Sequence, residues 1–358
     1  LVKENEGRYE WPLDVNDEEQ GSSRNALLNR YWRAPARELR GELTSDNFPY
    51  TNLEALDNIS FADFLRQQGA SESAIEVIGL GYYDQVGDGP ESYSALSVFA
   101  ESTLFSGLDW SRGAFQIAGG NDLLPRAFAD RLPGRVNYST RVVAVSQDDR
   151  GVRLTVESPD GRHQVDGDHV ICTAPLHLLG GIEFGAALSA GRQNAFSRIE
   201  CTSITRVFLQ FRKRFWESAG RHPGARTDLP IQSIVPTTMT QSGPRGILES
   251  FSGGAKARML GALSDDEAID RVLHFVSKIH PEARDNYEAG AVVRWDDEPG
   301  VRGCQAFFRP GQMHEMFPML AEPEGRIHFA GDHIGGAPGY TVSALLSAQR
   351  AALQVLQA

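Results

Sequence analysis

A short apolar run near the end of the sequence leads into small residues and one carboxylate, a combination that could hold an electron-rich ligand. Segment 326–330 has the length and apolar character of a buried strand. Gly331 and Asp332 follow it, and then a loop rich in glycine and proline at 335–339. Thr341 is placed to cap a helix that continues to about residue 353. A strand, a glycine loop and a helix together present unpaired helix N–H groups to a ligand, although an ordinary strand-to-helix corner has the same pattern.

A second glycine-containing turn stands in the middle of the sequence. Gly119 and Gly120 precede a predicted helix at 123–132, with Pro125 in its first turn. Further strands are predicted at 141–145, 151–156, 163–165 and 168–175, with a turn at 159–161 between the second and third. The last of these strands ends in Ala174-Pro175.

The remaining segments differ in their predicted secondary structure. The first hundred residues are predicted to be mainly helical, with Ser60 capping a helix at 61–69 and further helices at 26–43, 71–81 and 94–103. A new sheet begins at 204–216, where apolar residues alternate up to the basic cluster Arg212-Lys213-Arg214. Its other strands are predicted at 227–230, 246–251 and 291–295. Ser264 and Glu267 have the spacing of a capping box for a helix that ends at 279.

Composition narrows the class of protein. The 358 residues are 41% hydrophobic and 23% charged, as in globular chains. The net charge of −12 argues against a nucleic-acid partner or an anionic membrane surface. Three widely spaced cysteines indicate neither a disulfide framework nor a metal site. No apolar run approaches the roughly 18 residues of a membrane-spanning helix.

Four motifs together resemble the flavin-containing amine oxidases, especially their L-amino acid oxidase branch. The first and most specific is F-A-G-D-x5-P-G-Y-x3-A-L-x-S-A-x-R-A-A at 329–352. The others are G-G-x3-L-P-x-A-F at 119–128, V-I-x-T-A-P at 170–175 and R-W-x3-P-x3-G at 294–303. Each of the three shorter motifs is weak alone, but their order matches the family from about residue 50 onward.

The resemblance implies FAD as the cofactor and assigns residues to it. Asp332, after Gly331, is implied to contact the ribityl chain, while Thr341 and Val342 face the N1–C2=O edge of the flavin. The remaining implied cofactor contacts are Val142 at the adenine, Ala174 and Pro175 beside the pyrophosphate, and Trp295 near the flavin ring.

The resemblance also implies a substrate site. Gly339 offers its carbonyl group to the substrate amine, and Tyr340 and Phe251 form apolar walls. A lysine near the Phe-Trp pair holds water at flavin N5 in this family. Lys213 is the residue expected in that role here, with Arg212 competing for the position.

The implied fold is α/β with α+β features. It comprises a mainly helical domain at 1–105, a discontinuous Rossmann-like FAD-binding domain at 106–200 and 321–358, and a mixed-sheet substrate-binding domain at 201–320. The implied reaction is oxidation of an L-amino acid by oxygen, through hydride transfer to flavin N5, to a 2-oxo acid, ammonia and hydrogen peroxide. A monoamine or polyamine oxidase and a non-catalytic flavin-fold subunit remain as alternatives.

One expected motif is missing. Flavin amine oxidases carry a G-x-G-x-x-G turn that brings the backbone close to the pyrophosphate, and these 358 residues contain none. Together with the start at Leu1, this leads us to expect that the chain is one product of a longer precursor, with a truncated chain as the alternative. A second chain would then supply the dinucleotide-binding unit in a homo- or hetero-oligomer.

Overall fold

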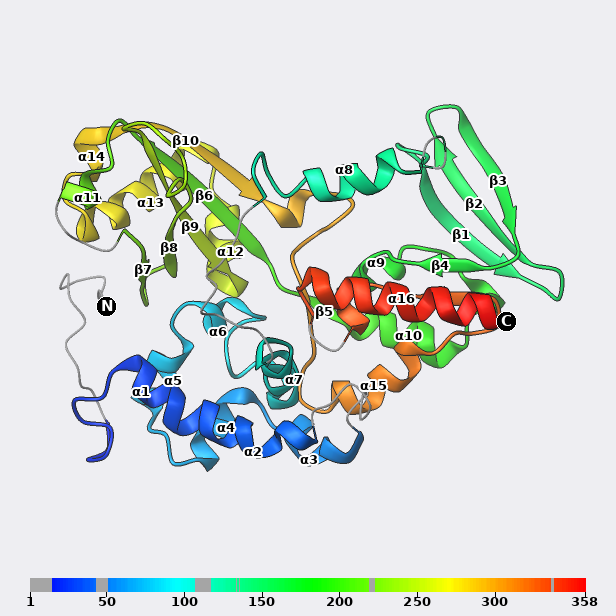
Figure 1. Cartoon of the computed structure of the whole chain (residues 1–358), viewed down its shortest axis with the longest axis horizontal. Coiled ribbons are helices and arrows are strands. Elements are labelled where there is room, and N and C mark those ends of the chain that lie inside the picture. Colours follow the sequence, from blue (N-terminus) through cyan, green and yellow to red (C-terminus); the bar gives the residue numbers. More distant parts are fainter. Residues whose placement is uncertain are drawn as a thin grey trace.

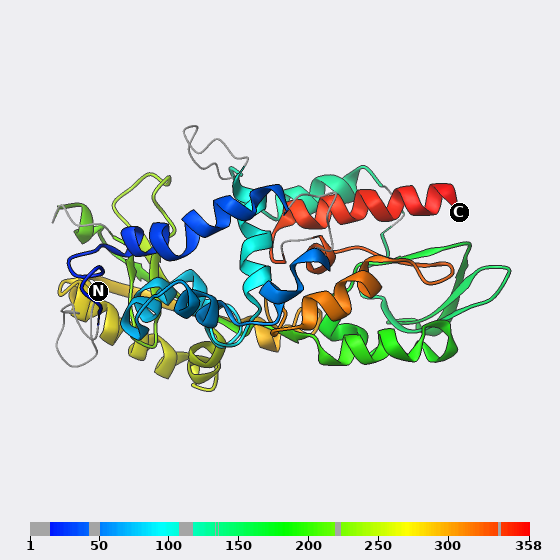
Figure 2. The same ribbon diagram turned by 90° about the horizontal axis from the view of Figure 1, so that it is seen from below.

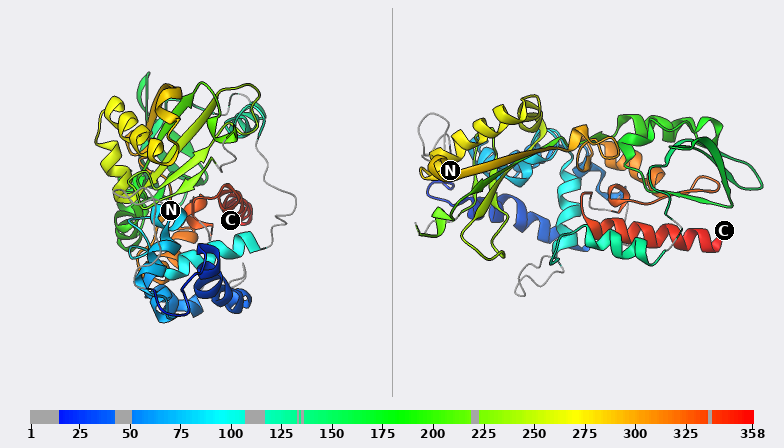
Figure 3. Two further views of the ribbon diagram at one scale, coloured as in Figure 1. Left: turned by 90° about the vertical axis from the view of Figure 1, so that its left-hand side faces the viewer. Right: turned by 90° about the horizontal axis from the view of Figure 1, so that it is seen from above.

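The computed structural model describes residues 15–42, 51–106, 117–132, 134, 136–218, 223–335 and 338–358. The protein is a mixed α/β molecule with a helical block, an antiparallel sheet lobe and a third part around the C-terminal helix (Figure 1). Figures 2 and 3 show that it is elongated, with the sheet lobe and the end of the C-terminal helix at opposite ends. The domain boundaries at 105, 200 and 320 stay predictions.

The helical block confirms the helical character predicted for the start of the chain. Ser60 caps α4, and Ser71 caps α5, each through a side-chain oxygen that accepts a backbone N–H bond. Phe61 and Phe99 are fully buried in its core. Its elements are α1 (Arg24–Leu28), η1 (Asn29–Arg33), α2 (Ala34–Glu38), η2 (Leu39–Gly41), η4 (Thr51–Leu53), α3 (Glu54–Asp57), α4 (Phe61–Gln67), α5 (Glu72–Gly79), α6 (Tyr82–Gln85) and α7 (Ala95–Ser106).

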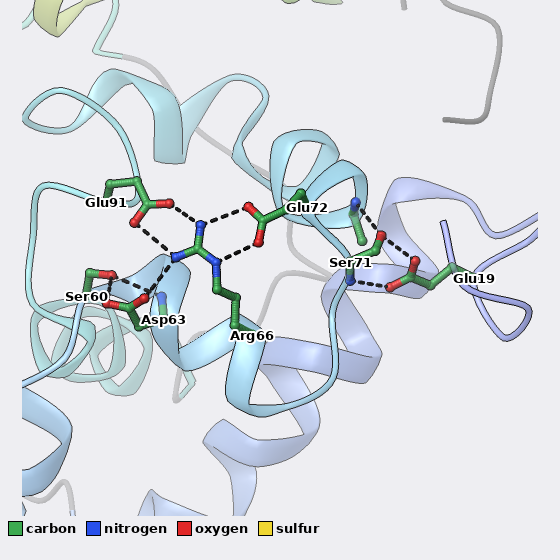
Figure 4. A network of polar contacts seen from close by, with 8 residues as sticks. Glu19, Ser60, Asp63, Arg66, Ser71, Glu72 and Glu91 are labelled. Carbon is green, nitrogen blue, oxygen red and sulfur yellow. Dashed lines mark hydrogen bonds and ion pairs between the residues drawn. The ribbon is translucent and has the colours of Figure 1, made fainter. Parts of the chain in front are cut away.

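Polar contacts join these short helices where they turn (Figure 4). Arg66 donates hydrogen bonds to three carboxylates, those of Asp63, Glu72 and Glu91. On the other side of α5, the buried Glu19 accepts from the backbone N–H of Ser71 at 2.9 Å and from its hydroxyl at 2.6 Å. Polar contacts between its helices therefore stabilise the block in addition to its apolar core.

The sheet lobe has five antiparallel strands in the order β10-β6-β9-β8-β7. In β6, Val207 and Leu209 are fully buried in the core that also holds α13. Arg206 and Phe208, which alternate with them along the strand, therefore lie on the opposite, more open face of the sheet. The capping box of Ser264 and Glu267 at the start of α13 is confirmed. The elements of the sheet lobe are β6 (Ile204–Phe211), α11 (Phe215–Ser218), β7 (Ala225–Arg226), β8 (Ser233–Pro236), β9 (Gly246–Gly253), α12 (Gly254–Gly261), α13 (Asp265–Ile279), α14 (Ala283–Asn286), β10 (Tyr287–Arg294) and η7 (Trp295–Asp297).

The predicted strand at 227–230 is wrong. These residues form the turn between β7 and β8, in which the Gln232 N–H donates to the Leu229 carbonyl oxygen at 2.9 Å. Pro230 has no N–H for a strand ladder, and Gln232 has a positive φ of 46°. The turn places β7 at the edge of the sheet.

The third part holds the C-terminal segment. The strands β4 and β12 form a parallel pair, and an isolated parallel bridge joins Ala144 to Glu183. The strands β1, β2 and β3 form a separate antiparallel sheet around the predicted turn at 159–161. The elements of this third part are α8 (Leu123–Asp130), β1 (Arg141–Gln147), β2 (Val152–Ser158), β3 (Gly161–Gly167), β4 (Val170–Cys172), α9 (Leu176–Leu179), η6 (Gly185–Ala187), α10 (Ala190–Arg198), β5 (Glu200–Cys201), β11 (Ala306–Phe307), α15 (Gln312–Ala321), β12 (Ile327–Phe329), η8 (Asp332–Ile334) and α16 (Thr341–Gln357).

Two helices of this part carry exposed apolar side chains. Helix α8 has no buried residue, and Phe128 on it is 56% exposed. Helix α16 exposes a second set of large apolar residues: Val342, Leu345, Leu346, Leu353 and Leu356. Across the described ranges, no helix combines the length and the hydropathy needed to cross a bilayer.

Candidate functional site

The carboxyl ends of β4 and β12 lie side by side. Cys172 and Phe329 are register partners, and the Ala330 N–H donates to the Cys172 carbonyl oxygen at 3.0 Å. Ala174 and Pro175 leave β4 at the same edge from which Gly331 and Asp332 leave β12. Ligands of parallel α/β sheets bind at this edge. The structure thus brings together four of the residues that the sequence placed at the cofactor.

Gly331 and Asp332 shape the loop after β12. Gly331 has φ +147°, and a Cβ atom there would lie 2.1 Å from the His333 ring, so no side chain fits. The half-buried Asp332 accepts a hydrogen bond from the Gly339 N–H at 2.7 Å. Burial raises the pKa of Asp332, but His333 and the Gly339 N–H outweigh it and hold the pKa below its ordinary value. The carboxylate therefore stays charged and ties both ends of the loop.

Helix α16 begins one residue earlier than a Thr341 cap requires. Tyr340 is the N-cap and Thr341 the first helical residue, so the prediction that Thr341 caps the helix is wrong. The Tyr340 side chain does not cap the helix, and among the described residues the N–H groups of Thr341 and Val342 have no acceptor. Both residues are exposed. An uncapped, accessible helix N-terminus fits an electron-rich edge such as that of a reduced flavin.

The two residues before α16 contact other parts of the molecule. A Cβ atom at Gly339 would lie 2.5 Å from Gln305 Oε1, so the loop backbone runs directly over Gln305. The Tyr340 hydroxyl donates to Glu101 Oε1 on α7 at 2.5 Å. These contacts fix the glycine loop against the helical block and against the segment that leads into β11.

A cavity of about 510 Å³ lies between the sheet lobe and the helical block. Its walls come from both parts of the molecule: Phe251 from β9, Gln85 and Val86 from the helical block, and Cys304 and Gln305 from the segment before β11. Gln85 Nε2 donates to Ser233 Oγ at 2.8 Å and to the Phe251 carbonyl oxygen at 2.7 Å, which joins the two walls. Gln305, which lines this cavity, also lies against Gly339 of the α16 loop.

An arginine lies beside Phe251 on the open face of the sheet. Arg206 on β6 is the register partner of Phe251, and its guanidinium carbon is 5.3 Å from the centre of the Phe251 ring. The same guanidinium forms an ion pair with Glu249, whose side chain is only 1% exposed. This arrangement places a fixed cation next to Phe251, one of the residues that line the cavity.

Cys304 lies between these two groups of residues. Its exposed surface faces the cavity, where surrounding protein displaces water. Burial raises the pKa of the Cys304 thiol, and Asp332 raises it further, whereas Arg206 acts in the opposite direction. Cys304 and Gln305 both line the cavity, and Gln305 lies against Gly339 of the α16 loop.

Three residues expected at the site lie apart from this cluster. Lys213 is exposed in the turn after β6, roughly 30 Å along the chain from Ile204 at the cavity end of that strand. Val142 lies in β1 of the separate sheet, half-buried beside a bulge. Trp295 is nearer, because its carbonyl oxygen accepts from the Gly303 N–H at 3.0 Å, next to Cys304.

The sequence did not single out four residues that the structure brings to the cavity or beside it. Three line the cavity, Arg226, Cys304 and Gln305, and Arg206 lies next to Phe251. Only Arg206 had a sequence signal, because a charged residue interrupts the apolar positions of its strand. In the ranges described, no group of histidine, cysteine and acidic residues is arranged as a metal site.

Comparisons with known proteins show which family the chain belongs to. The family model of flavin containing amine oxidoreductases matches residues 2–356. The chain is 29% identical to an L-amino-acid oxidase of Demansia vestigiata, covering 100% of this chain and 68% of that protein. It is 30% identical to the putative L-amino-acid oxidase YobN of Bacillus subtilis (strain 168), covering 92% and 67%.

Solved structures agree on the fold. Putrescine oxidase bound to putrescine superimposes with a TM-score of 0.79 at 20% identity, covering 98% of this chain and 78% of that one. Cyclohexylamine oxidase from Brevibacterium oxydans IH-35A gives 0.73 at 19% identity, covering 92% and 74%.

The family match defines an oxidoreductase that uses FAD. The chain belongs to the flavin-containing amine oxidoreductase family.

Proposed function

We propose that the protein oxidises an L-amino acid to a 2-oxo acid. The amino acid, oxygen and water give the 2-oxo acid, ammonia and hydrogen peroxide. When bound, FAD would supply the hydride acceptor, with oxygen as the final oxidant. The observation that supports this reaction most directly is the cavity of about 510 Å³, which is lined by Phe251 and by Gln305, the residue that lies against Gly339 of the loop ahead of α16. The L-amino-acid oxidases among the relatives favour the same substrate class.

Residues of the loop and of the cavity have different proposed roles in binding the substrate and the cofactor. Gly339 accepts a hydrogen bond from the neutral substrate amine through its carbonyl oxygen, while Tyr340 and Phe251 enclose the substrate and exclude water. The other proposed contacts lie along the cofactor: Gly331, Asp332, Thr341 and Val342 at the C-terminal loop, Ala174 and Pro175 beside it, Trp295 near the ring and Val142 at the adenine.

The basic residue near the reacting carbon needs a separate proposal. Lys213 remains the residue expected from the family pattern, but it is exposed and lies at the far end of β6. Arg206 lies at the cavity end of the same strand and is held by Glu249. We infer that Arg206, rather than Lys213, supplies the positive charge next to the substrate.

We also propose that a separate polypeptide supplies the G-x-G-x-x-G unit. The exposed apolar residues of α16 and α8, together with Ile171 at 38% exposure on β4, are the kind of surface that a βαβ unit covers. Native mass spectrometry of the FAD-bound protein tests this proposal. A mass equal to one copy of this chain plus FAD, with no second polypeptide, would refute it.

The flavin absorbance bands of the purified protein test the reaction. We expect them to bleach when L-amino acids are added without oxygen, and to return in air with release of peroxide and ammonia. Bleaching by primary amines but not by L-amino acids would show a monoamine or polyamine oxidase. A flavin that no amine bleaches would contradict the proposed function.

A further inference from the structure

The substrate cavity contains a side-chain amide that the proposed chemistry does not use. Gln305 is half-buried and lines the cavity, and its amide forms no hydrogen bond with any residue in the described ranges. Other polar lining groups are already bonded. Gln85 Nε2 donates to Ser233 Oγ, and Thr202 Oγ1 accepts a backbone N–H at 3.0 Å. The Gln305 amide is therefore available to a molecule that enters the cavity.

Two backbone hydrogen bonds fix the position of Gln305. The Thr202 N–H donates to the Gln305 carbonyl oxygen, and the Cys304 N–H donates to the Thr202 carbonyl oxygen, each at 2.9 Å. Two successive residues thus oppose Thr202, as in a β-bulge, a feature that changes the direction of a side chain. Thr202, Cys304 and Gln305 all line the cavity. The strand pairing therefore holds Gln305 on the cavity side.

The end of the Gln305 side chain lies against the backbone of Gly339. A Cβ atom added at Gly339 would lie 2.5 Å from Gln305 Oε1 and 3.0 Å from its Cδ, and Gly339 has φ +92°. A side chain at this position would therefore strain the loop and displace the amide. The Gly339 N–H is already used, since it donates to Asp332 at 2.7 Å. In the part of the chain that the structure describes, no donor bonds the Gly339 carbonyl oxygen.

Two neighbouring acceptors suit a primary amine. A neutral amine has two N–H groups, and burying either of them without an acceptor costs free energy. The Gly339 carbonyl oxygen can accept from one, but a single hydrogen bond leaves the amine free to rotate about it. A second acceptor fixes the direction of the neighbouring C–H bond, which must face the hydride acceptor. Arg226, the cation among the described lining residues, offers donors and no acceptor.

We propose that Gln305 Oε1 is the second acceptor for the substrate amine, beside the carbonyl oxygen of Gly339. This inference rests on the proposed function and adds the residue that orients the amine. The two acceptors come from segments far apart in sequence, the bulge before β11 and the loop before α16. Each is held by its own hydrogen bonds, Gln305 by Thr202 and Gly339 by Asp332, so the amine meets a preformed site.

Two non-reacting ligands that differ at one group test the inference. α-Methyl-L-phenylalanine has no hydrogen on its α-carbon, so it cannot be oxidised, and 2,2-dimethyl-3-phenylpropanoate has a methyl group in place of the amine. Calorimetry with the FAD-bound protein gives the ratio of the two affinities, amine over methyl. We expect Gln305→Met to lower this ratio about three- to tenfold. Gln305→Glu should raise it, because a carboxylate accepts strongly from an ammonium group. Gln164→Met, at an exposed position on β3, is the matched control and should leave the ratio unchanged.

The outcomes separate this inference from the proposed function. A ratio that Gln305→Met leaves unchanged would overturn the inference, because any loss shared by both ligands reflects the shape of the cavity and not the amine. If Gln305→Met fails to bind FAD, Gln305→Glu decides, and a ratio that does not rise would overturn the inference. Bleaching of the wild-type flavin by L-phenylalanine, with a ratio independent of Gln305, would keep the proposed function alone. A ratio that depends on Gln305, without bleaching by any amine, would keep the amine site and refute the proposed function.

Discussion

The Tyr340 hydroxyl donates a hydrogen bond of 2.5 Å to the Glu101 carboxylate, which joins the residue before α16 to helix α7. The bond connects a loop near the C-terminus to the helical block more than two hundred residues earlier. It fixes the orientation of the Tyr340 ring, which we propose as a wall of the substrate site. The aromatic wall therefore depends on the helical block for its position.

Replacing Tyr340 with phenylalanine tests this dependence. The ring remains, but the charge-assisted hydrogen bond is lost, and we expect the free energy of unfolding to fall by about 1.5–3 kcal/mol. Urea denaturation measures the change. Glu101→Gln is the control, because its amide oxygen still accepts from Tyr340 and should retain more of the stability. Equal stability of Tyr340→Phe and wild type would show that the bond does not stabilise the protein.

Variants of Arg206 and Lys213 decide which cation acts at the site. We expect Arg206→Met to slow anaerobic flavin reduction at least about tenfold. Without the guanidinium the substrate would be held less accurately, and small displacements of the reacting atoms slow a reaction strongly. Lys213→Met should change that rate less than about twofold. Stopped-flow absorbance with an L-amino acid measures both, and Arg206→Lys shows whether the charge alone suffices. The reverse order of effects would restore Lys213 to the role that the family pattern suggests.

Arg206→Met should also destabilise the fold. It leaves Glu249, whose side chain is 1% exposed, without its ion-pair partner. Because Arg206 itself is 32% exposed, we expect a loss of about 2–3 kcal/mol, below the range for fully buried pairs. The double variant Arg206→Met, Glu249→Gln should recover part of this loss in urea denaturation. No recovery would show that the buried charge is not the cause.

Glu19 should make the stability depend on pH. Burial raises its pKa, but hydrogen bonds from Ser71 and Asn16 outweigh it and hold the pKa below the ordinary 4.5. Its stabilisation is therefore complete above that value and is lost as the pH falls through the lower, folded-state pKa. The difference in unfolding free energy between wild type and Glu19→Gln should be constant above about pH 5.5 and shrink in more acidic buffer. Thermal unfolding across this range measures it, with the exposed Glu38→Gln as control. A difference that grows on acidification would contradict the assignment.

Arg66 should show the salt dependence of a surface network (Figure 4). Its three carboxylate partners raise its pKa, and its side chain is 34% exposed. Arg66→Lys keeps the charge but loses the paired bonds, so we expect a loss of about 1 kcal/mol at low salt and less in 1 M sodium chloride. Arg153→Lys, which has the single partner Asp166, should cost less at either salt concentration. If Arg66→Lys and Arg153→Lys lost the same unfolding free energy at both salt concentrations, the three carboxylate partners of Arg66 would add nothing beyond a single ion pair.

Local signals predicted the fold best. The caps at Ser60 and Ser264 were readable because a side chain and an N–H group three residues later suffice to form them. At Thr341 the same reasoning missed by one residue, since the tertiary contact of Tyr340 with Glu101 sets where α16 begins.

The site was harder to predict because distant segments assemble it. The family pattern pointed to Lys213, but only the sheet register shows that Arg206 and Phe251 are neighbours. Likewise, Arg226 and Gln305 share a cavity although they lie in strands and loops far apart in sequence. No periodicity in one segment contains that information.

The parallel pairing of β4 with β12 has a consequence for the order of folding. Segment 173–326 separates these strands, so the sheet lobe and much of the core lie within the loop that their pairing closes. Closing so long a loop is entropically costly until the intervening chain is compact. The edge that carries Ala174 and Gly331 therefore forms late, and during refolding the recovery of flavin binding marks a final step rather than the first.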